Sequence, residues 1–344
     1  MRTGTSSMNN QKSNDIMYLA SPLQVLSAID YCQEYKVRPI VIVNFGEMKR
    51  ATNRNQIASL LEKLPAIQIL EFKHFKNSIA RDLYTFIFML KLKKLPKANR
   101  FLIGDFRSKI ACNLFLANRA NKRIYIDDGA ATIAMQLEDI KHGFFAPALS
   151  KRQRLFQRAF DLLSGLNYAD LRCPDIYSIF DGEDFLRAEQ RNLRAPATRI
   201  KKNLIENCCF FFGSKYSESK LLGLEDEIHI ANTIRSHYVK SNIDFYYIPH
   251  RDESKAKLAK LEALGITVKN LNVPAEVYFQ EAPELPAHIS ACWSTVLYSV
   301  GKSYELTSVT SFDILDKVLK PQINQRAQTV YDFYEQCGIK RIKV

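Results

Sequence analysis

Short apolar runs alternate along the chain with segments of helical periodicity, and this alternation restricts the fold more than any other feature. The first runs lie at residues 16–20, 38–45, 66–72, 101–105 and 123–127, and a helical segment follows each of them. Parallel strands can be joined only through a long crossover, which is usually a helix. The first half of the chain therefore predicts a parallel sheet covered by helices.

The alternation stops over residues 141–185 and then begins again. Further strands are predicted at residues 208–212, 244–248, 265–271, 287–292 and 304–307, and a long helix at 312–337 closes the chain. This second series predicts a second sheet of the same kind. The predicted fold class is therefore α/β, with two doubly wound, Rossmann-like domains that face each other across a cleft.

The length of 344 residues also suits two domains better than one. Residues 189–205 are polar and basic and are interrupted by Pro196, so they are the predicted link. We expect a flexible tail at residues 1–15, an N-terminal domain at 16–190 and a C-terminal domain at 191–344.

Basic residues outnumber acidic ones by 49 to 36, which gives a formal charge of +13. This excess favours a polyanion, an anionic membrane surface or an anionic substrate as the partner. The basic segments at residues 91–97, 151–158 and 187–202 are equally consistent with solvated helix faces. No nucleic-acid-binding motif accompanies them, so we expect no nucleic acid partner.

Other features of the sequence concern the compartment of the protein. No apolar run approaches the ~20 residues that a membrane span requires, and no secretory signal opens the chain. The 7 cysteines include no C-x-x-C pair, and most of them lie in apolar runs. We therefore expect a reduced, cytoplasmic protein without disulfides and without a zinc site.

Polar residues gather where the predicted strands end, which is where ligands bind in open α/β sheets. The first half places Ser21, Asp105, Asp127 and Asp128 there, and the second half places Gly213, Ser214, His250, Arg251, Glu276, Ser294 and Thr295 there. Hydroxyls, helix starts and positive charge suit a phosphate, and carboxylates can accept a proton from an alcohol. Together they predict group transfer from a donor with a phosphate leaving group to a hydroxyl.

The acidic turn Asp127-Asp128-Gly129 also has a simpler interpretation as a helix cap and turn, although two acids exceed what a cap needs. Strand alternation continues the face of Tyr125 to Asp127, so only one acid should point at an acceptor. We favour Asp127, and a turn that swings Asp128 inward would reverse this choice. A neighbouring carboxylate is expected to raise the pKa of the base.

Three short motifs resemble those of bacterial sialyltransferases. They are Asp127-Asp128-Gly129, Pro249-His250 and Ser294-Thr295, and they occur in the family's order. Residues 18–24 and 247–253 are most similar to lipooligosaccharide sialyltransferases and capsular polysialyltransferases, and the resemblance covers about residues 16–310. The family histidine is often followed by proline, whereas here Arg251 follows and Pro249 precedes.

The resemblance implies a GT-B fold and roles for the site residues. Asp127 would be the general base, with Asp128 as its neighbour or substitute, and His250 would protonate or hydrogen-bond the leaving phosphate. Ser294 and Thr295 would hold that phosphate. The other donor-binding residues would be Gly213, Ser214, Pro249, Arg251 and Glu276, the last on the ribose, and the acceptor side would include Ser21, Gln24 and Asp105.

The resemblance also implies a substrate and partners. The donor would be CMP-sialic acid or a related CMP-activated nonulosonic acid, and the reaction would invert the anomeric carbon without a metal or other cofactor. The acceptor would be a lipooligosaccharide or capsule glycan, and basic helices near Lys91 and Lys151 would hold the enzyme against the anionic inner membrane face. The alternatives are CMP-Kdo, CMP-pseudaminic or CMP-legionaminic acid as donor, or a non-catalytic basic protein that binds a polyanion.

Overall fold

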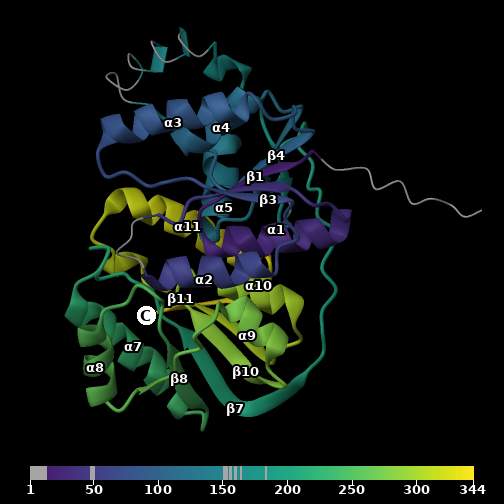
Figure 1. Ribbon diagram of the computed structural model, residues 1–344. Coiled ribbons are helices and arrows are strands. Elements are labelled where there is room, and N and C mark those ends of the chain that lie inside the picture. The colour runs from purple at the N-terminus through teal and green to yellow at the C-terminus, as the bar shows by residue number, and fades with distance from the viewer. Residues whose placement is uncertain are drawn as a thin grey trace, which may run out of the picture.

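The computed structural model describes residues 14–46, 51–149, 154, 157–158, 161–162, 165–182 and 184–344. Two parallel sheets organise these residues, one in each half of the chain (Figure 1). Each sheet has 6 strands, and helices pack on its faces. Residues 1–13 of the tail predicted at 1–15, and most of the basic segment at 151–158, lie outside the described residues, whereas Asp15 is described and buried.

The first sheet has the strand order β3-β2-β1-β4-β5-β6. Its strands are β1 (Ile16–Leu19), β2 (Ile40–Val43), β3 (Gln68–Glu71), β4 (Arg100–Ile103), β5 (Lys122–Ile126) and β6 (Asp175–Tyr177). The helices of this half are α1 (Pro22–Tyr35), α2 (Ala51–Glu62), α3 (Ser78–Leu92), α4 (Lys109–Asn118) and α5 (Ala130–Ala134), and α5 continues as the π-helix η1 (Met135–Ile140).

The second sheet has the order β12-β11-β10-β7-β8-β9. Its strands are β7 (Asn203–Phe212), β8 (Asp244–Ile248), β9 (Thr267–Val268), β10 (Glu284–Ala291), β11 (Ser308–Asp313) and β12 (Lys340–Lys343). The helices are α7 (Leu224–Val239), α8 (Lys255–Ala263), α9 (Ala275–Glu281), α10 (Val296–Ser303) and α11 (Pro321–Gln336).

Both sheets have the same winding. The first strand of each lies centrally, the next two follow on one side, and the chain then crosses to the other side. The order therefore reverses between β1 and β4 in one sheet and between β7 and β10 in the other. Ligands of doubly wound sheets bind outside the carboxyl ends of the strands at such reversals. The sequence prediction of two doubly wound α/β domains is confirmed.

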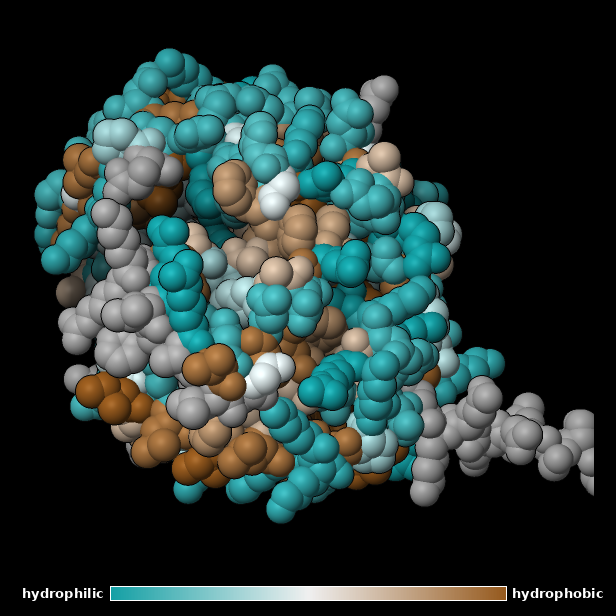
Figure 2. All heavy atoms as spheres, turned by 90° about the horizontal axis from the view of Figure 1, so that it is seen from above, coloured by the Kyte–Doolittle hydropathy of each residue, from teal (hydrophilic) through white to brown (hydrophobic). Residues whose placement is uncertain are grey.

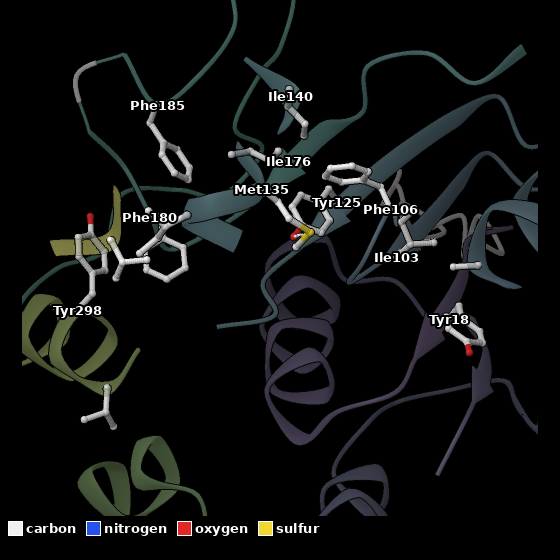
Figure 3. Close-up of a cluster of buried hydrophobic side chains, with 14 of the residues drawn as sticks. Tyr18, Ile103, Phe106, Tyr125, Met135, Ile140, Ile176, Phe180, Phe185 and Tyr298 are labelled. Atoms are coloured by element: carbon white, nitrogen blue, oxygen red, sulfur yellow. Dashed lines mark hydrogen bonds between the residues drawn. The ribbon is translucent and has the colours of Figure 1, made fainter. Parts of the chain in front are cut away.

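The central strands are apolar because both faces of each sheet are covered. Residues 16–19 of β1 and 41–43 of β2 are all buried. Tyr125 of β5 is fully buried, and its hydroxyl donates to the Met135 sulfur over 3.3 Å. Figure 3 shows Tyr125 and Met135 together with Phe106 in this cluster. These strands hold the turns that follow them in fixed positions.

Two predicted elements near the end of the chain are wrong. No strand covers residues 304–307, and β11 lies at residues 308–313 instead; the last helix begins at Pro321 rather than at residue 312. Strand β11 contains buried Ser311, whose hydroxyl donates to the Cys292 carbonyl over 2.6 Å. Polar residues that are satisfied inside a sheet hide the apolar pattern of a strand.

Helix α11 connects the two halves, and Figure 1 shows it beside α5. Arg326 on α11 donates to Asp139 of η1 over 3.0 Å. Phe333, which is 2% exposed, packs against Phe180 and Phe185 of the loop after β6, with ring centroids 6.0 and 5.3 Å away. It also packs against Tyr298 of α10. This aromatic cluster, partly visible in Figure 3, joins the two domains.

Removal of the Phe333 ring should therefore destabilise the protein. Phe333→Ala is expected to lower the free energy of unfolding by ~3–5 kcal/mol, because it leaves a cavity among aromatic rings. Urea denaturation measures this change. Phe144→Ala is the control, since Phe144 is 66% exposed and its loss should matter little. Equal effects of the two substitutions would contradict the role of the cluster.

Candidate active site

The two acids after β5 point to different partners. Asp127 is 2% exposed, and both of its carboxylate oxygens are in use. The Ser178 hydroxyl donates to Oδ1 over 2.5 Å, and the Ile179 amide donates to Oδ2 over 2.8 Å. Both donors belong to the loop after β6. Asp127 therefore ties that loop to the end of β5.

Asp128 is partly exposed and turns toward the start of α1. Its Oδ1 accepts from the Ser21 hydroxyl over 2.9 Å and from Gln24 Nε2 over 2.8 Å. Its Oδ2 has no hydrogen-bond partner in the part of the chain that the structure describes. Both oxygens of Asp127 are therefore in use, whereas Asp128 could take a proton on Oδ2 without losing either hydrogen bond.

The Gln24 side chain passes over Gly104 to reach Asp128, at the point where the strand order of the first sheet reverses. Its Oε1 accepts from the Ala20 amide over 2.8 Å, which fixes the side-chain amide. A Cβ at Gly104 would lie 2.1 Å from the Gln24 side chain, so residue 104 must lack one for Gln24 to stay in place. Ser21, Gln24 and Asp128 thus form one hydrogen-bonded group at the reversal between β1 and β4.

Burial raises the pKa of both acids. The pKa of Asp127 rises to about 6, with burial as the largest cause and hydrogen bonds from Ser178 and Ile179 acting against it. The pKa of Asp128 also rises to about 6 through burial, opposed by Gln24 and Ser21. The expected repulsion between the two acids is not the main cause. Both are mostly ionised at pH 7 and able to accept a proton.

Asp105, predicted for the acceptor side, is already engaged. Its Oδ1 accepts from the Arg107 amide over 2.8 Å and from Arg107 Nε over 3.0 Å. It lies at the end of β4, where the sequence placed it. The local ion pair gives it a role in shaping the turn.

His250 lies in the loop after β8, between the partly buried Pro249 and the exposed Arg251. Its Nδ1 accepts from the Asp252 amide over 3.1 Å, which leaves the proton on Nε2. Burial, followed by the charge of Arg251, lowers the pKa of His250 to about 4. The imidazole is therefore neutral at pH 7, and its Nε2–H can donate a hydrogen bond to an anion.

A buried cation supports the His250 loop. Lys257 of α8 is fully buried and contacts Glu227 over 2.7 Å, Glu253 over 3.1 Å and Glu218 over 3.2 Å. Glu253 in turn accepts from the His250 amide over 2.7 Å. Burial alone would lower the pKa of Lys257, but Glu253 and Glu227 outweigh it and raise the pKa. The ammonium stays charged.

The same lysine holds the turn after β7. Lys257 Nζ donates to the Ser214 carbonyl over 2.8 Å. A Cβ on Gly213 would lie 2.2 Å from the Tyr247 hydroxyl and 2.6 Å from Glu253 Oε1, so glycine is required there. Lys257 therefore positions Ser214 and His250 together. The predicted donor-binding residues Gly213 and Ser214 and the predicted catalytic residue His250 therefore share one supporting group.

Thr295 and Glu276 belong to two further turns of the second domain. Thr295 precedes α10, and its hydroxyl accepts from the Ala130 amide of the first domain over 2.6 Å. Ser294 precedes it, and its carbonyl accepts from the Tyr334 hydroxyl over 2.9 Å. Glu276, at the start of α9, accepts from the Ser299 hydroxyl over 2.8 Å.

The structure thus brings the predicted residues into two groups. Asp128, Ser21 and Gln24 lie beside the turn that contacts Thr295, and His250 lies with Gly213 and Ser214 around Lys257. No hydrogen bond or ion pair between described residues links His250 to Asp128.

Sequence reasoning missed Ser178, Glu253 and Lys257. The helical spacing of Glu253 and Lys257 was the available signal, but such a pair usually lies on a solvated face. Their burial depends on Glu218 and Glu227, which are distant in sequence. Among the described residues, no group of three or more histidine, cysteine or acidic side chains could hold a metal ion.

The two doubly wound sheets with facing strand ends define an α/β protein of the GT-B class. No protein-family model and no curated protein sequence matches the chain. Solved structures with a similar fold include Acinetobacter baumannii MurG, with 11% identity, a TM-score of 0.46, and coverage of 96% of this chain and 86% of that chain.

Two further similar structures are a UDP-N-acetylglucosamine 2-epimerase and a glycosyltransferase from Rickettsia africae. The epimerase has 13% identity and a TM-score of 0.47, covering 94% of this chain and 90% of that one. The glycosyltransferase has 9% identity and a TM-score of 0.45, covering 96% and 90%. The assignment of the fold rests on the strand order of the two sheets.

Replacement of Lys257 should disturb the supporting group strongly. Lys257→Met is expected to lower the free energy of unfolding by ~3–5 kcal/mol, because it leaves buried carboxylates without their cation. Lys260→Met is the matched control on the same helix, since Lys260 pairs with Glu225 at an exposed position and should change stability by less than ~1 kcal/mol. Urea denaturation of both variants compares them, and similar losses would contradict a special role for Lys257.

Proposed function

We propose that the protein is an inverting glycosyltransferase that moves sialic acid, or a related nonulosonic acid, from a CMP-activated donor to a hydroxyl of a cell-surface glycan. One observation carries the proposal: an acidic turn of one sheet meets a hydroxyl-bearing turn of the other. Asp128 lies in the acidic turn and Thr295 in the hydroxyl-bearing turn. The Ala130 amide, just after the acidic turn, donates to the Thr295 hydroxyl over 2.6 Å. The GT-B fold and the three motifs support a sugar nucleotide as the donor.

In the proposed reaction, Asp128 rather than Asp127 is the base. The acceptor hydroxyl gives its proton to Asp128 Oδ2 as its oxygen bonds to the anomeric carbon of the donor. The bond from that carbon to the phosphate oxygen breaks, and CMP leaves with the electron pair. Ser21 and Gln24 hold the other oxygen of Asp128 and so fix the direction of the carboxylate.

The leaving phosphate is stabilised by neutral donors in this scheme. His250 donates through Nε2–H, and the hydroxyls of Ser214, Ser294 and Thr295 are the other candidates. Because the pKa of His250 is lowered to about 4, it acts as a hydrogen-bond donor unless the bound phosphate raises that pKa. Glu276 would bind the ribose, and no step needs a divalent cation.

Replacement of the two acids should separate their roles. Asp128→Asn is expected to lower kcat for CMP release by at least ~100-fold with an unchanged melting temperature, because an amide cannot accept the proton. Asp127→Asn should instead lower stability, since Asp127 accepts two buried hydrogen bonds. Steady-state assays with CMP-sialic acid and a galactose-terminated acceptor, run in EDTA, measure the rates. Full activity of Asp128→Asn would refute the base assignment.

The pH profile gives a second readout of the same assays. Since the pKa of Asp128 is raised to about 6, its carboxylate is protonated as the pH falls through 6. The wild-type rate should therefore fall about tenfold per pH unit below that point.

The choice of donor can be tested by ligand stabilisation. CMP and CMP-sialic acid at ~100 times their Kd should stabilise the folded protein by ~2.7 kcal/mol, which thermal shift detects. CMP-Kdo, CMP-pseudaminic acid, CMP-legionaminic acid and UDP-sugars complete the panel. His250→Ala should shrink the shift with CMP, while Phe144→Ala should leave it unchanged. If only UDP-sugars raise the melting temperature, the proposed CMP-activated donor is wrong and a UDP-sugar takes its place. If no nucleotide raises it and the protein binds DNA tightly, the polyanion-binding alternative is favoured.

The proposed acceptor implies work at a membrane. Glycans of lipooligosaccharides are built on a lipid, so the proposal includes peripheral contact with the anionic inner face. No helix among the described residues is long and apolar enough to cross a bilayer. The enzyme would have to reach such an acceptor from the membrane surface.

A further inference from the structure

Helix α3 carries apolar side chains on two opposite faces. Thr85, Phe88, Met89 and Leu92 are buried against the first domain. The other face exposes large apolar residues at spacings of four, four and three: Ile79 is 77% exposed, Leu83 60%, Ile87 45% and Leu90 45%. This spacing aligns them in one row, which we call the α3 stripe. A row of such residues at a surface marks a contact site.

Basic residues flank the α3 stripe at both ends. The acids between residues 71 and 99 are Glu71 and Asp82, which pair with Arg54 and Lys109. Exposed lysines outnumber them before the helix, in its last turn and after it, at Lys73, Lys76, Lys91, Lys93, Lys94 and Lys97. Figure 2 looks onto this end of the molecule and shows brown side chains gathered along its lower left margin, where α3 lies, with teal ones among them. The surface is apolar along its middle and positive around it.

We propose that the α3 stripe docks on an anionic lipid bilayer, with Ile79, Leu83, Ile87 and Leu90 in the acyl boundary and the flanking lysines on the headgroups. A helix that combines an apolar row with lysines at its edges is the form that lies in a membrane interface. Lysines near an anionic leaflet strengthen the binding, and salt weakens it.

Charge argues against other occupants. Two copies of the chain joined through α3 would bring their lysine clusters together, which opposes a dimer. Nucleic acid would find no stacking platform, because the stripe is aliphatic. The proposal stands on this surface alone and does not depend on the transferase reaction.

Vesicle flotation of the full chain tests the proposal. Wild-type protein should float with vesicles of 70% phosphatidylcholine and 30% phosphatidylglycerol, and much less with phosphatidylcholine alone or in 0.5 M NaCl. The double variant Leu83→Glu/Ile87→Glu should bind the anionic vesicles at least about tenfold more weakly, because two exposed apolar side chains that would enter the acyl boundary are replaced by charges. Lys91→Gln/Lys94→Gln should reduce the preference for the anionic lipid.

The control is Val239→Glu on α7. Val239 is 47% exposed, close to the 45% of Ile87, but it lies in the second domain, so its change should not affect flotation. Melting temperatures of all variants are compared to exclude unfolding. The proposal fails if wild-type protein does not float with anionic vesicles or if the α3 variant floats equally well. It also fails if light scattering shows a wild-type dimer that the α3 variant dissociates, because a second copy would then cover the stripe.

Discussion

The contact between the Ala130 amide and the Thr295 hydroxyl, 2.6 Å long, sets the two domains against each other at the site. It depends on Gly129, because a Cβ there would lie 2.8 Å from the Thr295 hydroxyl oxygen. The aromatic cluster around Phe333 and the Arg326–Asp139 contact also join the domains, and the Ala130–Thr295 hydrogen bond adds a direct contact between the acidic turn and the hydroxyl-bearing turn. Gly129 thus serves the domain contact as well as the turn.

Much of this arrangement could be predicted from the sequence, because open parallel sheets in general bind their ligands outside the carboxyl ends of the strands. Once the strands were placed, the reversals of order put Ser21, Gly213 and Ser294 at strand ends. The orientation of the two acids could not be predicted. Gly129 has φ of 78°, which breaks the alternation of the strand, and the partner of Asp127 is Ser178, far along the chain. The directions of the two carboxylates therefore depend on contacts between residues distant in sequence, which the local pattern of the strand does not reveal.

The buried charges around Lys257 could not be predicted from the local sequence either. Glu253 and Lys257 are spaced as an exposed helical pair, yet the lysine is fully buried. A buried ammonium needs several compensating groups, and Glu227 and the Ser214 carbonyl supply two of them. Only the fold brings these together. The same nitrogen contacts the Ser214 carbonyl and Glu253, which accepts from the His250 amide, so one buried charge holds both loops in place.

The pKa values alone do not distinguish the two acids, since burial raises both to about 6. Access to the carboxylate oxygens distinguishes them. Asp127 has a donor on each oxygen, and a proton arriving there would displace a hydrogen bond. Asp128 has both donors on Oδ1, so Oδ2 can take a proton without breaking either. In the proposed reaction, a base with a pKa near 6 would be strong enough to assist an alcohol and weak enough to release the proton to water at neutral pH, so the open oxygen of Asp128 is the reason for preferring it to Asp127 in that proposal.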